Sequence, residues 1–176
     1  LEAVKGIEKE VNAVFQASGK EPEAVLSALA EFQQKHPELS DIPYFRGMKL
    51  SAMIRTKQTD EAKKLAEGLI AKGLKTDDPT VLGTVAGALG TAKDNKELLA
   101  VAVKAAEAGV KLSGGKEPGP LYQLAEAHFA AGDKAKAKEY GAKAVEAADN
   151  ETLKKRIQKL TEKYSDEKKD EDKKDK

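Results

Sequence analysis

The stretch PLYQLAEAHFAAGDKAKAKEYGAKA, from Pro120 to Ala144, decides the predicted fold. It reads as two helices separated by a turn at Gly132-Asp133, and the first helix carries the bulky residues Leu121 and Leu124. Small residues stand where the two helices would cross: Ala125, Ala137 and Ala144. Only small side chains let two helix backbones approach closely, and bulky ones fill the space beside the crossing. The stretch therefore predicts a tightly packed helical hairpin.

The same hairpin is predicted to recur along the chain. A Leu-type position on the first helix is followed by a small position on the second helix after 12 or 13 residues. The pairs are Val11 with Ala24, Leu50 with Ala62, Val85 with Leu98, and Leu124 with Ala137. Successive Leu-type positions are 39, 35 and 39 residues apart, which indicates one hairpin geometry joined by loops of different length. The alternative interpretation is an irregular helical bundle whose alanine-rich helices fit any such template.

Prolines and glycines divide the chain into helical segments, because a proline inside a helix costs about 3 kcal/mol. The predicted helix starts are marked by Thr59-Asp60-Glu61, Asp78-Pro79 and Asp94 with Glu97, and the stops by Gly19, Gly73 and Gly132. The predicted helices cover residues 1–17, 22–35, 44–57, 60–72, 79–92, 95–112, 120–131, 133–148 and 150–164. The first eight form four hairpins, since short connections make consecutive helices antiparallel neighbours.

The last predicted helix differs from the hairpins. It carries a stripe of apolar residues at spacings of 4, 3 and 4: Leu153, Ile157, Leu160 and Tyr164. Such a helix covers the apolar face that a terminal hairpin would otherwise expose to water. Residues 165–176 contain no apolar side chain, so we expect a disordered, charged tail that keeps the chain soluble. Electrostatic docking of the tail is the alternative.

Composition excludes several classes of protein. The 31 Lys and Arg residues nearly balance the 30 Asp and Glu residues, which argues against a nucleic-acid binder that works by bulk basicity. The absence of cysteine excludes disulfides, thiol catalysis and thiolate metal sites. The sequence contains no run of 18 apolar residues, so it predicts no membrane span. Because the chain begins with Leu1, we expect a processed or excised piece, with room for a covalent N-terminal domain.

No pattern in the sequence predicts catalysis. His36 precedes a proline at a helix end, and His128 lies in the hairpin interior, so both are interpreted as structural. Neither has metal ligands at helical spacing. Gly114-Gly115-Lys116 follows no apolar strand and is interpreted as a flexible loop rather than a phosphate loop. We therefore predict no enzyme activity and no cofactor.

The stretch from Pro120 to Ala144 resembles a tetratricopeptide (TPR) repeat. Leu124-Ala125 stands at the Leu-Gly position, His128 at the first aromatic position and Gly132-Asp133 at the turn. The sequence departs from the pattern where Leu121 replaces the usual Trp, where Gly141 replaces an aromatic residue, and where no proline closes the unit. The resemblance implies an all-α, right-handed superhelix of four helical hairpins plus a C-terminal capping helix over residues 1–164.

In this frame the first helix of each hairpin faces a concave groove. The residues predicted to line it are Phe45, Met48, Ala52, Arg55, Gly83, Gly87, Gly90, Tyr122, Glu126 and Phe129. Arg55 is the only cation in this set. The set suits a helix or an extended peptide. The alternative interpretation assigns Phe45, Met48 and Phe129 to an ordinary core.

The three glycines of this set weaken their helix by about 2–3 kcal/mol relative to alanine. Gly83, Gly87 and Gly90 lie at spacings of 4 and 3 on one helical face. Either a neighbouring helix packs against this flat surface, or an incoming chain approaches the backbone there. The sequence favours the neighbouring helix, which is the commoner reason, and leaves ligand approach open.

Residues 95–164 are also similar to the C-terminal helical-repeat extension of bacterial thioredoxin-like proteins, notably planctomycete-type ones. The similarity rests on the run from Glu97 to Ala108, the loop with Lys116-Glu117-Pro118, and the stretch from Leu121 to Ala147. In those relatives the extension follows a redox domain with a Cys-x-x-Cys motif and is commonly exported. The resemblance therefore implies an exported or periplasmic location and thiol chemistry on a domain outside this chain.

The sequence as a whole predicts a non-enzymatic scaffold that binds a protein or peptide partner, with no nucleic acid and no membrane involved. One alternative is an accessory C-terminal domain of a thioredoxin-like oxidoreductase. The other is a structural subunit of a larger assembly.

Overall fold

The computed structural model describes residues 2–39 and 42–164, and this part of the chain is all-α, with no strand. The predicted tail at 165–176 lies outside the described residues. The α-helices are α1 (Glu2–Ala17), α2 (Pro22–Lys35), α3 (Pro43–Arg55), α4 (Thr59–Lys75), α5 (Pro79–Leu89), α6 (Lys96–Leu112), α7 (Pro118–Ala130), α8 (Lys134–Ala147) and α9 (Glu151–Thr161). Short 3₁₀ helices η1 (Pro37–Leu39) and η2 (Glu162–Tyr164) follow α2 and α9.

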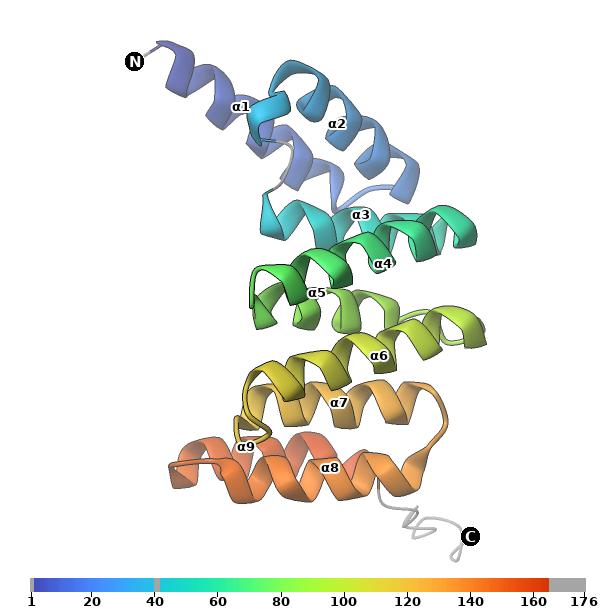
Figure 1. Cartoon of the computed structure of the whole chain (residues 1–176). Coiled ribbons are helices and arrows are strands. Elements are labelled where there is room, and N and C mark those ends of the chain that lie inside the picture. The colour runs from blue at the N-terminus through green and yellow to red at the C-terminus, as the bar shows by residue number, and fades with distance from the viewer. Residues whose placement is uncertain (1, 40–41, 165–176) are drawn as a thin grey trace, which may run out of the picture.

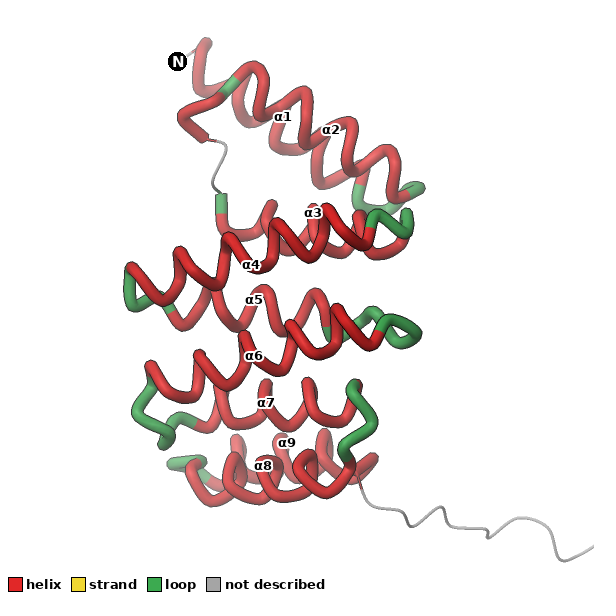
Figure 2. The backbone as a smooth tube through the Cα atoms, turned by 45° about the vertical axis from the view of Figure 1, so that its right-hand side comes forward, coloured by secondary structure: helices red, strands yellow, loops and turns green. Residues whose placement is uncertain are grey.

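Helices α1 to α8 follow one another along one long axis, and α9 lies behind α8 (Figure 1). Each helix packs on the next one, and α3 also contacts α5, α4 contacts α6, and α5 contacts α7. Two layers result, with α4, α6 and α8 in front of α3, α5 and α7, and the turned view agrees (Figure 2). Because each turn reverses the chain, helices of one layer run parallel to one another.

Side-chain caps define several helix starts. Asp78 accepts hydrogen bonds from the Thr80 and Val81 amides, at 3.0 and 3.3 Å, so α5 begins at its predicted cap. Helix α6 is capped by Asn95 rather than the predicted Asp94, because the Asn95 side chain accepts from the Leu98 amide at 3.0 Å. Both residues are good caps, and the sequence does not distinguish between them.

Helix stops are decided by backbone geometry. Gly132 follows α7 with a φ of +85°, a left-handed conformation that glycine adopts without strain, as the sequence predicts. Gly73 was expected to end its helix, but that prediction is wrong: α4 continues to Lys75. A Cβ at Gly73 would lie 3.1 Å from the Leu82 side chain. This glycine therefore permits close helix packing and does not end the helix.

Small residues bring the helices together. The predicted crossing residues Ala125, Ala137 and Ala144 are all fully buried, and the paired positions Ala62 and Leu98 are buried in the central core. The Leu-type positions Leu50, Val85 and Leu124 are buried in that central core, whereas Val11 is only half-buried. The hairpin pattern therefore coincides with the core from α3 onward and more loosely in the first hairpin.

The C-terminal end is closed by α9 and η2. Ile157 and Tyr164 of the predicted stripe are buried and Leu153 is half-buried, while Leu160 stays exposed. The Tyr164 ring fits over Gly141 on α8, where a Cβ would lie 3.2 Å from it. The missing side chain at Gly141 thus makes room for a tyrosine from the last turn.

Candidate partner groove

Two hollows lie along the layer formed by α3, α5 and α7. The first, of about 620 Å³, is called the α3 hollow and is lined by Ser18, Val25, Tyr44, Gly47, Met48, Ser51, Ala52, Arg55, Thr80 and Thr84. The second, of about 640 Å³, is called the α7 hollow and is lined by Ala86, Gly87, Gly90, Thr91, Lys93, Tyr122, Gln123, Glu126, Ala127, Phe129, Ala130 and Lys163. Helix α5 contributes to both, so we treat them together as the groove.

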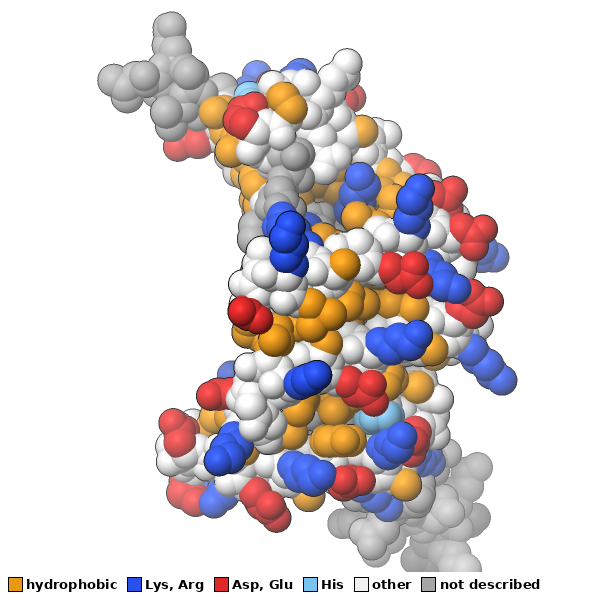
Figure 3. Space-filling view, in the orientation of Figure 1, with side chains coloured by type: hydrophobic (Ala, Val, Ile, Leu, Met, Phe, Trp, Pro, Cys, Tyr) orange, Lys and Arg blue, Asp and Glu red, His pale blue; other side chains and the backbone are white. Residues whose placement is uncertain are grey.

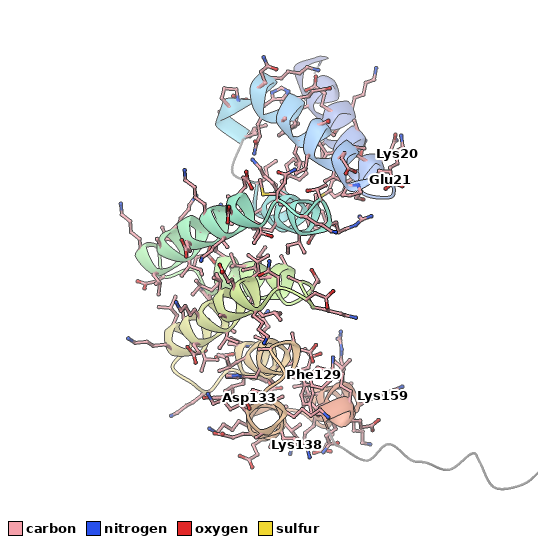
Figure 4. The ribbon with its side chains drawn as sticks, turned by 90° about the vertical axis from the view of Figure 1, so that its right-hand side faces the viewer. Lys20, Glu21, Phe129, Asp133, Lys138 and Lys159 are labelled. Atoms are coloured by element: carbon pink, nitrogen blue, oxygen red, sulfur yellow. The ribbon has the colours of Figure 1, made fainter. Side chains whose placement is uncertain are left out.

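The groove lies on one side of the molecule. In the view of Figure 4, Phe129, which lines the α7 hollow, lies on the side away from α4 and α6. The face formed by α4, α6 and α8 carries interspersed charges of both signs over narrow apolar bands (Figure 3).

Helix α3 supplies an aromatic and aliphatic wall. Tyr44, Met48, Ser51 and Arg55 follow each other at spacings of 4, 3 and 4, so they share one helical face. The Tyr44 ring lies 5.2 Å from the ring of Phe15 on α1. Tyr44 is 60% exposed and Phe15 is 41% exposed, so the pair presents apolar surface to solvent. They form an apolar ledge at the edge of the α3 hollow.

Helix α5 supplies a floor of small residues. The Thr84 hydroxyl donates to the Thr80 carbonyl at 2.9 Å, so it is satisfied within its own helix. Gly87 is exposed, and a Cβ at this position would meet no atom of the described residues within 4 Å outside its chain neighbours and the backbone of its own helix. The backbone of α5 is thus open to the groove at Gly87.

The three predicted glycines have different surroundings. Gly83 is buried beneath Gln123 of α7, whose Oε1 would lie 2.5 Å from a Cβ. Gly90 caps the end of α5, and a Cβ there would lie 3.2 Å from the Ala86 carbonyl oxygen. The sequence left two interpretations open for these glycines. Packing against a neighbouring helix applies to Gly83, whereas the backbone at Gly87 is open to an incoming chain.

Helix α7 forms the other wall, and its acidic residue is held by the C-terminal segment. The Tyr164 hydroxyl donates to Glu126 Oε1, and Lys163 Nζ donates to Glu126 Oε2 at 2.8 Å. Burial raises the pKa of the Tyr164 hydroxyl, and the hydrogen bond to Glu126 raises that pKa further. Burial and the same carboxylate also raise the pKa of Tyr122. Both tyrosines therefore keep their protons at neutral pH.

Eight of the ten residues predicted for the groove line the two hollows. They are Met48, Ala52 and Arg55 in the α3 hollow, and Gly87, Gly90, Tyr122, Glu126 and Phe129 in the α7 hollow. Phe45 is 3% exposed and packs edge-on against Phe32, so it belongs to the core between α2 and α3. Gly83 is covered by Gln123, as described above.

Sequence reasoning missed several lining residues. Tyr44 continues the spacing of Met48, Ser51 and Arg55 by one helical turn, so an extended spacing analysis would have found it. Lys93 lies in the turn after α5, and Lys163 lies in η2. No periodicity marks either lysine, because neither one is part of an α-helix.

The two histidines have structural surroundings. His36 Nε2 pairs with Glu10 of α1, and its ring lies 5.1 Å from that of Phe32. Hydrogen bonds from His36 and Lys35 lower the pKa of Glu10. His128 is buried and stacks on Tyr140 at 5.6 Å, and burial lowers its pKa. Across residues 2–39 and 42–164, no group of three potential ligands is arranged for a metal ion.

Within the same described residues, no helix is both long and apolar enough to cross a bilayer. Comparison with protein-family models, with curated proteins and with solved structures finds no match to this chain. The resemblances to TPR repeats and to the extension of thioredoxin-like proteins therefore stay predictions.

Proposed function

We propose that this chain is a non-enzymatic interaction module, a TPR-like right-handed superhelix that binds a peptide or a partner domain in the groove. The observation that carries the proposal is the groove itself, two hollows along one layer with α5 common to both. A helical layer whose apolar side chains stay accessible is typical of surfaces that bind an amphipathic or extended segment.

The open floor at Gly87 supports the same function. A glycine inside a helix costs about 1 kcal/mol relative to alanine, and packing within the described structure does not use the space that it leaves. A side chain at position 87 would fill part of the groove. Gly87 therefore lets the backbone of a ligand approach α5 closely.

The test is a leucine substitution at Gly87. Since a Cβ there meets no atom, Gly87→Leu keeps the thermal midpoint within a few degrees of wild type but blocks the groove. Affinity capture from native extract, followed by quantitative mass spectrometry, compares partners retained by the wild type and the variant. We expect the variant to lose the partners that the wild type enriches.

The matched control is Gly68→Leu. Gly68 is also an exposed helical glycine with open space around it, but it lies on α4, outside the groove. Equal retention of partners by wild type and Gly87→Leu, or equal loss in both leucine variants, would contradict binding in the groove.

A further inference from the structure

We propose that the segment bound in the groove is acidic, with aspartate or glutamate residues flanking apolar anchor side chains. This inference rests on the proposed function and specifies the chemistry of its partner. It follows from the charges of the groove and from where they lie.

The ionisable side chains of the two hollows are mostly cationic. Arg55 is the one charged residue that lines the α3 hollow, and Lys93, Lys163 and Glu126 are those of the α7 hollow, within the described part of the chain. The single carboxylate already accepts hydrogen bonds from Lys163 and Tyr164. Its charge is therefore compensated internally, and Arg55 and Lys93 are left to attract a ligand.

The side chains of Arg55 and Lys93 form no hydrogen bond or ion pair to any residue in 2–39 or 42–164. Arg55 is the last residue of α3, and Lys93 follows the end of α5. Gly47 lies against Thr84, so the parallel register of the two helices places both cations at the same edge of the layer. Asp94, the neighbour of Lys93, does not line either hollow.

The rest of the groove is apolar or neutral. The ledge of Phe15 and Tyr44, with Met48 beside it, offers contacts for an aliphatic or aromatic side chain at one hollow. Phe129 and Ala130, both only half-buried, offer such contacts at the other. The cations along one edge would attract carboxylates, and the apolar surface beside them would contact aliphatic or aromatic side chains. The groove therefore complements a segment in which acidic and apolar residues alternate.

A nucleic acid fits this surface less well. The whole chain has a formal net charge of only +1, and the cations of the groove are few and lie at one edge. Affinity for a phosphate backbone needs many Lys and Arg contacts along its track.

The experiment is selection from a phage-displayed library of random 12-residue peptides on the immobilised full chain. We expect the enriched peptides to contain more Asp and Glu than the input library, next to aromatic or aliphatic residues. Neutral or basic enriched peptides would overturn the inference.

The most enriched peptide is then synthesised with fluorescein, and its binding is measured by fluorescence anisotropy. The double variant Arg55→Glu, Lys93→Glu should raise Kd at least about tenfold, and 0.5 M NaCl should also weaken binding. The matched control is Lys64→Glu, Lys104→Glu, which reverses two exposed charges on α4 and α6 and should leave Kd unchanged. Equal weakening in both double variants, or displacement of the peptide by a 12-residue oligothymidylate, would overturn the inference.

Gly87→Leu separates failure of this inference from failure of the proposed function. If the enriched peptides lack acidic residues but bind the wild type and not Gly87→Leu, the inference of an acidic partner is wrong and binding in the groove still stands. No enrichment on the wild type, or peptides that bind Gly87→Leu equally well, overturn both.

Discussion

At the scale of single residues, Gly87 and Gly141 show how differently one residue type is used in this protein. Both lie inside helices, but Gly87 faces open space and Gly141 faces Thr161 and Tyr164. The same substitution to alanine therefore has opposite expected effects, because one site gains helix propensity and the other loses space.

We expect Gly87→Ala to raise the free energy of unfolding by about 0.5–1 kcal/mol, since alanine restricts the unfolded chain and adds no clash. Gly141→Ala should lower it by about 1–3 kcal/mol, because its Cβ would lie 3.2 Å from Thr161 Cγ2 and from the Tyr164 ring. Urea denaturation followed by circular dichroism measures both. A stabilised Gly141→Ala would contradict the close contact with η2.

His128 makes stability depend on pH. Burial lowers its pKa below the ordinary value of 6.5, so the unfolded chain binds a proton more readily than the folded chain does. Stability from this residue is therefore complete above about pH 6.5 and is lost as pH falls from there towards the lower folded pKa. Among the described residues His128 Nε2 has no hydrogen-bond partner, so a proton there would also lack an acceptor.

The measurement is urea denaturation at a series of pH values between about 7 and 5.5, above the range where most carboxylates titrate. We expect the free energy of unfolding of the wild type to fall with pH in this range, and that of His128→Gln to be less dependent on pH. His36→Gln serves as the control. Because it keeps His128, its free energy of unfolding should depend on pH as that of the wild type does. An unchanged slope in His128→Gln would show that this residue does not carry the effect.

At the scale of elements, η2 joins the terminal helix to the groove. Tyr164 is 1% exposed, its ring contacts Phe129 of α7 at 5.1 Å, and its hydroxyl reaches Glu126 on the same helix. The closing segment of the stack therefore also orients the acidic residue of the α7 hollow.

We expect Tyr164→Phe to lower the free energy of unfolding by about 1.5–3 kcal/mol, the usual net contribution of a hydrogen bond to a charged group. The ring stays in place, so the loss measures the hydroxyl alone. Tyr44→Phe is the comparison, because Tyr44 is exposed and its hydroxyl makes no hydrogen bond to the described residues. A loss of equal size in both variants would argue against a specific role of the Tyr164–Glu126 bond.

At the scale of the whole molecule, the chain is a linear stack in which each helix contacts only near neighbours in sequence (Figure 1). Its largest buried cluster spans α3 to α7, while the first hairpin shares a separate cluster with α3. In such a stack the ends can open while the centre stays folded.

Hydrogen exchange should therefore be graded along the axis. We expect the amides of α5 and α6, which pack on helices from both sides, to exchange slowest, and those of α1 to exchange fastest among the helices. Peptide-resolved mass spectrometry after deuterium labelling measures this order. Uniform protection from α1 to α9 would indicate one cooperative unit instead of a stack.

The sequence by itself was sufficient for the all-α class and for most helix ends. Alanine-sized residues at helical spacing, together with caps such as Asp78 and the turn at Gly132, act locally, so their effect can be read from neighbouring positions. Eight of the predicted groove residues also line a hollow, because helical periodicity determines which side chains share a face.

Only the tertiary structure decided what covers each face. Gly83 and Gly87 are one turn apart, yet Gln123 of α7 lies over the first, and no described side chain lies over the second. Likewise Lys93 and Lys163 reach the same hollow from a turn and from η2, far apart in the chain. Contacts between distant segments depend on how whole helices are placed against one another, and no local spacing in a single sequence records that placement.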